Sequence, residues 1–200
     1  MTTMNTKIAV GVMESIKEIY LRHELEDFVV KIEDTEIKCH RFILSCSKYF
    51  CEHFRSGIKE VTDGRDPLRG ISCDTFKLIL EALYTGINVV TKDNAIAIWF
   101  ASIQLQIDFM IELCEKMVVK MLSLDNFEEI YRNAKLINSK QIIGAIPNFV
   151  KMHFVQVRRM KTFYELPYRQ FLNIVRDQKL VAECEDLVLE SIMEWVEYPD

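Results

Sequence analysis

The chain has 200 residues, half of them hydrophobic, with 6 glycines, 4 prolines and a net charge of −5. This composition is typical of a well-packed, mainly helical globular protein with one or two domains. The acidic balance argues against direct nucleic-acid binding, and no apolar run is long enough to form a membrane-spanning helix.

The first predicted element is an amphipathic helix that begins near residue 8. Its apolar residues recur at helical spacing at Ile8, Val12, Ile16 and Ile19. An apolar stripe of this kind needs a covering surface. That surface is either the rest of the helix's own domain or a second copy of the chain.

The same segment bears on the compartment of the protein. The apolar run at residues 8–13 is too brief for the core of an export signal and meets Glu14 at once. We therefore expect a cytoplasmic protein, with the nucleus as an alternative, and the six cysteines are expected to be free thiols.

Residues 28–39 predict a β-hairpin. Apolar and polar residues alternate on both sides of a polar turn at residues 33–35, which is the period of strands with one buried face. The expected inward residues are Phe28, Val30, Ile32, Ile37 and Cys39. After His40 the apolar spacing becomes helical, which predicts two short helices within residues 42–54.

This stretch resembles the signature of a BTB/POZ domain. The resemblance rests on Asp27 at the start of a strand, "CHRFILS" at residues 39–45 and "YF" at residues 49–50. It implies an α+β fold in which a small sheet is flanked by helices. BTB domains of this kind dimerise through an N-terminal helix, so the resemblance places a dimer interface at Ile8, Val12, Ile16, Ile19, Asp27 and Arg41.

Asp27 and Arg41 also have an interpretation that does not use the resemblance. A carboxylate and a guanidinium at these positions predict a semi-buried ion pair that fixes the hairpin to the first short helix. Such a pair specifies geometry more surely than it adds stability.

A short motif follows the second short helix. "GIKEV" at residues 57–61 resembles the hydrophobic–any–Glu motif of BTB proteins that recruit cullin-3, and it stands where that family carries it. The resemblance implies cullin contacts at Phe54, Ile58 and Glu60. The alternative is an ordinary loop with Ile58 as its anchor. The surrounding residues are irregular, with a short strand expected near Leu68 and Ile71.

Three helices and one further strand complete the first predicted domain. A helix from Asp74 closes at Gly86, and residues 87–91 are expected to form a short strand. Thr91 is expected to cap a helix over 93–105. Asp108 is expected to cap another helix, whose inward stripe is Met110, Leu113, Cys114, Met117 and Met121. "YTG" at residues 84–86 and "LQI" at residues 105–107 also resemble the BTB pattern, and the domain is predicted to span residues 1–122.

Residues 123–200 predict a run of helices separated by short polar turns. Asp125 with Glu128 is expected to form a capping box, Asn138 with Gln141 a second helix start, and Pro167 a helix boundary. "FEEIYRNAKLINSKQII", "FYELPYRQFLNIV" and "EDLVLESIMEWV" resemble the all-α BACK domain that follows BTB in Kelch-like adaptors.

The BACK resemblance has two implications. BACK domains usually run longer, so the chain is expected to stop inside one, and the apolar last helix with Leu187, Leu189, Ile192 and Trp195 agrees with that. The first BACK helices resemble the region called the 3-box, which adds Asn126, Tyr131 and Phe149 to the expected cullin contacts.

The remaining charged and metal-binding residue types predict no site. Arg158, Arg159 and Lys161 form a local basic patch, and seven acids but no Lys or Arg follow Leu180; both are interpreted as solvated faces. The group Cys39, His40, Cys46, Cys51 and His53 lacks a zinc-ligand spacing, so buried thiols are preferred to a metal site. Cys73 is the best candidate for a redox-sensing thiol.

The predicted function is that of a protein-binding module. The chain has no glycine-rich phosphate loop and no strained nucleophile turn, so we expect neither an enzyme nor a cofactor. We expect a homodimeric substrate adaptor of a cullin-3–RING ubiquitin ligase, whose substrate binds a part of the protein outside this chain. The alternative is a self-association scaffold with cytoskeletal or transcriptional partners and no ligase. The substrate cannot be read from the sequence, and a viral Kelch-like protein fits as well as a cellular one.

Overall fold

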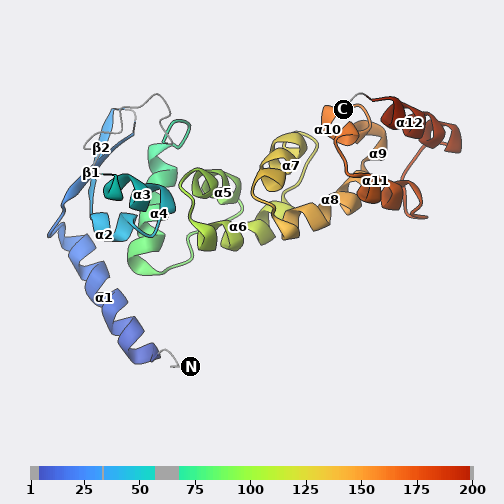
Figure 1. The fold of residues 1–200 in the computed structure, drawn as a ribbon. Coiled ribbons are helices and arrows are strands. Elements are labelled where there is room, and N and C mark those ends of the chain that lie inside the picture. Colours follow the sequence, from blue (N-terminus) through green and yellow to red (C-terminus); the bar gives the residue numbers. More distant parts are fainter. Residues whose placement is uncertain (1–4, 33, 57–67, 199–200) are drawn as a thin grey trace. The chain divides into compact units, whose positions relative to one another are not determined.

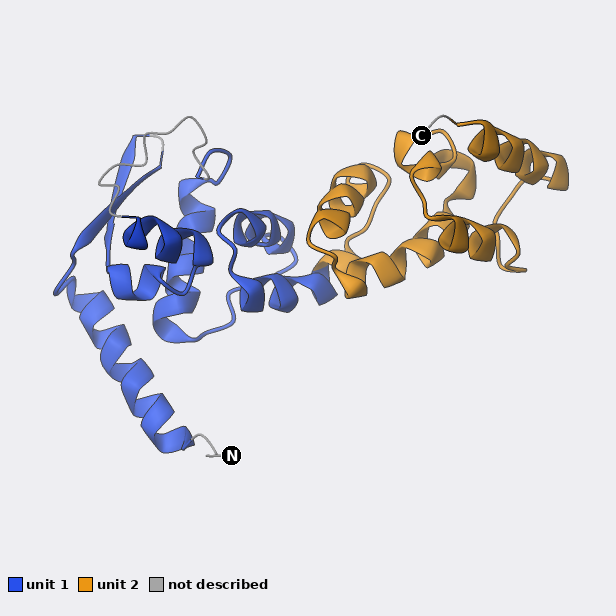
Figure 2. Ribbon diagram, viewed as in Figure 1, with its two compact units in different colours: residues 1–117 blue, residues 118–200 orange. Residues whose placement is uncertain are grey.

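The computed structural model describes residues 5–32, 34–56 and 68–198, and the chain divides into two compact units, residues 1–117 and 118–200 (Figure 2). The first unit contains α1 (Thr6–Arg22), β1 (Phe28–Ile32), β2 (Thr35–Cys39), α2 (Arg41–Leu44), α3 (Lys48–Arg55), α4 (Cys73–Thr85), α5 (Ala95–Gln104) and most of α6 (Asp108–Lys120). The second contains α7 (Phe127–Leu136), α8 (Lys140–Met152), α9 (Phe154–Val157), α10 (Lys161–Tyr164), α11 (Tyr168–Val175) and α12 (Glu185–Glu197) (Figure 1). The predicted α+β fold with a helical second part is confirmed.

The predicted hairpin is present, and its inward face is the predicted one. β1 and β2 pair antiparallel, with Phe28 opposite Cys39 and Ile32 opposite Thr35. Val30, Ile32 and Cys39 are buried, while the residues that alternate with them are exposed. Period-two alternation places every second side chain on one face, so this pattern alone determined which face packs on the core.

Ser47 fixes the start of α3 to the turn between α5 and α6. Its hydroxyl oxygen accepts the Phe50 N–H at 3.2 Å, which caps the helix, and its hydroxyl donates to the Leu105 carbonyl at 2.6 Å. The Lys48 N–H also donates to the Gln106 carbonyl at 3.3 Å. Two bonds from neighbouring residues therefore hold α3 against a turn more than fifty positions away in the sequence.

Two predicted strands do not form in the described residues 68–71 and 87–91. Leu68 and Ile71 are buried, but they lie in a turn closed by the Ile71 N–H and the Leu68 carbonyl at 3.0 Å. At residues 87–91, Asn94 takes the backbone groups that a strand would use. Its amide oxygen accepts the Thr91 N–H at 2.7 Å and its amide nitrogen donates to the Val89 carbonyl at 2.9 Å. As a result α5 begins at Ala95 after Asn94, and Thr91 is not its cap.

The second unit differs from the prediction at its first turn. Asn126, not Asp125, shapes this turn, because its side chain accepts the Ser123 N–H and donates to the Met121 carbonyl, each at 2.9 Å. Glu128 accepts from the Thr162 hydroxyl at 3.3 Å instead of closing a capping box. The expected boundary at Pro167, directly before α11, is confirmed.

The cap of α8 lies one residue later than predicted, at Ser139. Its hydroxyl oxygen accepts the Ile142 N–H at 3.2 Å. Asn138, the predicted start, instead has a φ of 53°, which is the left-handed backbone that asparagine tolerates well at the end of a helix.

Aromatic residues build the core of the second unit. Phe163 meets Phe154 and Phe171 edge to face, with ring centroids 5.7 and 5.6 Å apart. All three rings are buried, and they come from α9, α10 and α11. Edge-to-face packing of this kind adds to the free energy of area burial, so these rings join the short helices into one body.

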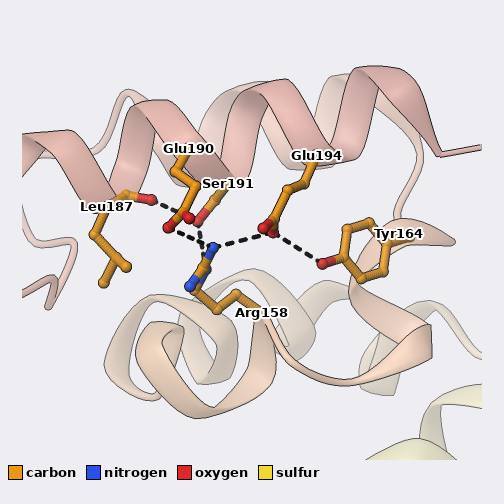
Figure 3. A network of polar contacts seen from close by, with 6 residues as sticks. All are labelled: Arg158, Tyr164, Leu187, Glu190, Ser191 and Glu194. Carbon is orange, nitrogen blue, oxygen red and sulfur yellow. Dashed lines mark hydrogen bonds and ion pairs between the residues drawn. The ribbon is translucent and has the colours of Figure 1, made fainter.

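The prediction that residues 158–161 and the acids after Leu180 form separate solvated faces is wrong for Arg158. Arg158 comes from the basic patch, yet its guanidinium contacts Glu190, Ser191 and Glu194 of the acidic α12 (Figure 3). Its side chain is only 11% exposed. Arg159 and Lys161 do remain exposed.

The described residues offer neither a membrane span nor a metal site. None of their helices is both long and apolar enough to cross a membrane. Within the same residues, no group of three or more His, Cys, Asp or Glu side chains is arranged to hold a metal ion.

Candidate interaction surfaces

Helix α1 packs on α4 by one side and leaves an apolar strip exposed. The Tyr20 ring stacks on the Tyr84 ring with centroids 4.1 Å apart, yet no residue of α1 is buried. The predicted stripe is divided, since Ile16 and Ile19 are half-buried whereas Ile8 is 67% and Val12 52% exposed. Its own domain therefore covers one side of α1, whereas Ile8 and Val12 have no covering surface among the described residues of this unit.

His40 ties the end of α1 to α4. Its Nε2 lies 2.7 Å from the Glu24 carbonyl and its Nδ1 lies 2.6 Å from the Tyr84 hydroxyl. Because a carbonyl only accepts, Nε2 carries the proton and Nδ1 accepts from the Tyr84 O–H. The same hydroxyl oxygen accepts the His40 backbone N–H at 3.0 Å. Burial raises the pKa of Tyr84, so the hydroxyl keeps the proton that this arrangement needs.

Asp27 and Arg41 lie together, but not as the predicted ion pair. The Asp27 carboxylate accepts the backbone N–H of Arg41 at 2.8 Å, and both residues are exposed. The Arg41 guanidinium lies 5.3 Å from the ring centroids of both Phe28 and Phe54. The link between hairpin and α2 is therefore a cap-like hydrogen bond, and the cation is held by aromatic faces instead of a carboxylate.

Phe54 belongs to an aromatic cluster at the end of α3. Its ring meets Phe28 edge to face at 4.9 Å and is half-buried. Ile58 and Glu60, the other two expected cullin contacts in the first domain, lie outside the described residues.

The start of α6 carries apolar residues that the sequence interpretation did not assign to a surface. Phe109 is 53% and Leu113 is 40% exposed, one helical turn apart. Leu113 was expected to point inward, and Phe109 was not singled out. An ion pair between the Lys48 ammonium and the Asp108 carboxylate joins the starts of α3 and α6. The i, i+4 spacing of Phe109 and Leu113 is consistent with an apolar strip on the surface of α6. Met110 and Cys114 have the same spacing but are buried, so spacing alone does not tell which pair is exposed.

The three expected cullin contacts in the second unit have different environments. Tyr131 is only 1% exposed, and burial raises its pKa to about 12. The Asn126 side chain is used by its turn, as described above. Phe149 is half-buried and lies between the rings of Phe127 and His153, with centroids 5.1 and 4.6 Å away. Phe149 is thus the one of the three whose ring offers accessible apolar surface.

The cysteines divide by burial. Cys39 and Cys114 are buried, and this raises the pKa of each thiol to about 12. Cys46 and Cys184 are exposed, while Cys73, the redox candidate, is partly exposed. All six are free thiols, as expected.

Comparison with known proteins matches both units to families. The family model described as "BTB/POZ domain" matches residues 16–122, and the one described as "BTB And C-terminal Kelch", or BACK, matches residues 127–200. The predicted domain boundary at residue 122 remains our proposal beside these ranges.

Similar curated proteins carry Kelch in their names, and one of the three described here is also named for a BTB domain. The chain is 27% identical over 197 residues to human Kelch repeat and BTB domain-containing protein 2, which covers 98% of this chain and 32% of that protein. It is 31% identical over 171 residues to zebrafish (Danio rerio) Kelch-like protein 40b, covering 85% and 28%. It is 28% identical over 184 residues to mouse Kelch-like protein 41, covering 92% and 30%. The chain thus spans about a third of the length of these relatives, and it belongs to the BTB/POZ domain family, with a BACK region following its BTB/POZ domain.

Proposed function

We propose that this chain is the dimerising and cullin-binding part of a substrate adaptor for a cullin-3–RING ubiquitin ligase. It performs no chemistry itself. It holds a cullin at one surface while another part of the protein holds the substrate, so that ubiquitin transfer gains from proximity.

The observation that supports the proposal is the place of the Ile58–Glu60 motif in the sequence, directly after α3. The motif begins three residues after α3 ends. α3 has eight residues and is about 12 Å long, and its start is fixed beside the start of α6 by Ser47 and Lys48. The exposed Phe109 and Leu113 supply apolar surface on α6, the helix whose start is joined by an ion pair to the start of α3.

The proposed cullin surface has one patch on each unit. On the first unit it comprises Phe54, Ile58, Glu60, Phe109 and Leu113, of which the last two are additions from the structure. On the second unit it comprises Phe149 and Asn126. Tyr131 is buried, so we assign it the role of supporting these residues and not of contacting the cullin. Lys135 lies 5.4 Å from the Tyr131 ring centroid, and its ammonium also pairs with the Glu165 carboxylate at 3.7 Å.

The proposal is tested by isothermal titration of the chain with the recombinant cullin-3 N-terminal domain. Ile58 is the expected anchor, and loss of an anchor at an interface centre costs about 2 kcal/mol or more. Ile58→Asp should therefore weaken binding by at least ~30-fold. Glu60→Ala should have a smaller effect, about 0–1 kcal/mol, if its carboxylate lies at a solvated rim. The matched control is Val181→Asp, the same kind of change at an exposed apolar residue of a loop in the second unit.

Two outcomes would favour the scaffold alternative. One is the lack of measurable heat and of co-elution at tens of micromolar protein. The other is unchanged affinity in Ile58→Asp. In either case self-association through α1 would remain as the function to explain, since the exposed Ile8 and Val12 do not depend on a cullin.

A further inference from the structure

Helix α12 is held on the second unit with little side-chain burial. Among its thirteen residues only Ser191 is buried, while its apolar residues Leu187, Val188, Ile192 and Trp195 are half-buried. Its opposite face exposes the apolar residues Leu189, Met193 and Val196. Most of the stability of a helix in a protein comes from packing of its apolar face, so packing against the described residues alone stabilises α12 only weakly.

A single guanidinium supplies a polar attachment, which we call the Arg158 latch (Arg158, Tyr164, Glu190, Ser191 and Glu194). Arg158 Nε donates to the Ser191 hydroxyl oxygen at 2.7 Å, and its Nη2 donates to Glu190 at 2.9 Å and Glu194 at 3.0 Å (Figure 3). The Ser191 hydroxyl donates onward to the Leu187 carbonyl at 2.6 Å, and the Tyr164 hydroxyl donates to Glu194 at 3.1 Å. The latch thus engages two turns of α12 from residues that lie between α9 and α11 in the chain.

The aromatic contact beside the latch contains polar groups that lack hydrogen-bond partners in the described residues. The Trp195 indole stacks on the Phe171 ring with centroids 4.4 Å apart. Its Nε1–H is nevertheless buried without a hydrogen-bond partner in the described residues, and so is the Gln170 amide oxygen on α11. Buried polar groups without partners cost free energy, which offsets part of what the stacked rings contribute. The equilibrium between docked and undocked α12 therefore depends on the hydrogen bonds from the Arg158 guanidinium, because hydrogen bonds between charged groups are stronger than neutral ones.

From these observations we propose that α12 is a detachable strap. It docks and undocks as one unit while α7 to α11 stay folded, and the Arg158 latch sets the equilibrium between the two states. Undocking would free the Phe171 ring and the inner face of α12, namely Leu187, Val188, Ile192 and Trp195. The inference does not depend on cullin binding, because it concerns contacts within the second unit alone.

Hydrogen exchange of the intact 200-residue chain, followed by mass spectrometry, tests the proposal. In the unmodified protein, amide protection factors in residues 185–197 should be at least ~10-fold lower than those in α8, since local opening needs less free energy than unfolding of the core. Arg158→Met should lower protection in α12 by a further ~10-fold or more, as expected for the loss of hydrogen bonds to charged groups. Protection in α8 should not change.

Two matched variants separate the latch from general effects of charge. Arg159→Met removes the neighbouring exposed arginine and should leave α12 protection unchanged. Glu194→Gln should lower it, whereas Glu197→Gln on the exposed side should not.

The proposal is overturned if α12 and α8 exchange with equal protection in the unmodified protein, a measurement that needs no variant to fold. It is also overturned if Arg158→Met lowers protection in α8 as much as in α12, because the guanidinium would then support the whole unit. Equal effects of Arg158→Met and Arg159→Met would show that net charge, and not the latch, governs α12.

Discussion

At the scale of single residues, Tyr84 holds α1 directly through its ring and, by way of His40, through its hydroxyl. The ring stacks on Tyr20, and the hydroxyl satisfies the His40 backbone N–H and His40 Nδ1. Since α1 buries none of its residues, these contacts and the bond from His40 Nε2 to the Glu24 carbonyl carry much of its attachment.

Tyr84→Phe keeps the ring and removes the hydroxyl, so it should loosen α1 without unfolding the domain. The His40 N–H and Nδ1 would lose their shared partner in a partly buried site, at a cost of about 1–3 kcal/mol. Urea unfolding should report this loss, and amide exchange should show lower protection in α1 than in α5. Tyr168→Phe, at a tyrosine that is mostly exposed, is the control. Equal losses in the two variants would contradict the role given to the Tyr84 hydroxyl.

The thiols should differ in reactivity by position. Because the pKa of both Cys39 and Cys114 is raised to about 12 by burial, each remains a neutral thiol at pH 8 and is shielded from solvent. In the native protein, iodoacetamide at pH 8 should modify the exposed Cys184 and leave Cys39 and Cys114 unmodified until urea is added. Peptide mass spectrometry measures each site. Modification of Cys39 at the rate of Cys184 would contradict its placement in the hairpin core.

At the scale of elements, two serines cap helices in the same way but differ in their contacts to the rest of the fold. Ser47 and Ser139 each accept an N–H three residues on at 3.2 Å, and both are buried. Only Ser47 also donates across the fold, to the Leu105 carbonyl.

Ser139→Ala should cost about 1 kcal/mol of stability, which is typical for loss of a cap. Ser47→Ala should cost roughly 1–3 kcal/mol more, because it also leaves the Leu105 carbonyl without its side-chain donor. Urea denaturation followed by circular dichroism compares the two variants. A loss in Ser47→Ala no larger than in Ser139→Ala would mean that the bond to Leu105 contributes little.

The same scale shows what the sequence could predict. Alternation at Val30 and Ile32 and helical spacing around Phe76 depend on local periodicity, and they gave the hairpin and α4 correctly. The strand expected at residues 87–91 failed because Asn94 competes for its backbone groups, and such side-chain competition leaves no trace in apolar spacing. The environment of Arg158 was missed for another reason. Its partners lie more than thirty residues away, and a charge pattern gives no information on long-range pairing.

Of the candidate site, the sequence could supply the motif but not its surroundings. The resemblance located Ile58 and Glu60 and the N-terminal helix. It could not show that Ile16 turns toward its own domain while Val12 stays exposed, or that Phe109 joins the exposed set, because neighbouring helical positions share the same apolar character.

At the scale of the whole molecule, the exposed Ile8 and Val12 predict a dimer in solution. Light scattering at micromolar concentration should give a mass near twice 23.5 kDa. Val12→Asp should shift the mass toward the monomer, because it places a charge in an apolar contact. Leu136→Asp, at an exposed leucine of α7, should leave the mass unchanged. A monomeric mass for the unmodified chain across this concentration range would contradict the prediction.

The chain's two tryptophans fall one in each unit. Trp99 is fully buried in α5 of the first unit, and Trp195 stacks on Phe171 in the second. Tryptophan fluorescence is therefore the sum of two signals, one from each unit. A test of two-state unfolding requires probes of different regions to give coincident transitions, and this sequence contains such a pair without any label. Replacing either indole by phenylalanine would leave a chain whose emission follows one body alone, so the cooperativity between the BTB/POZ and BACK regions becomes directly measurable.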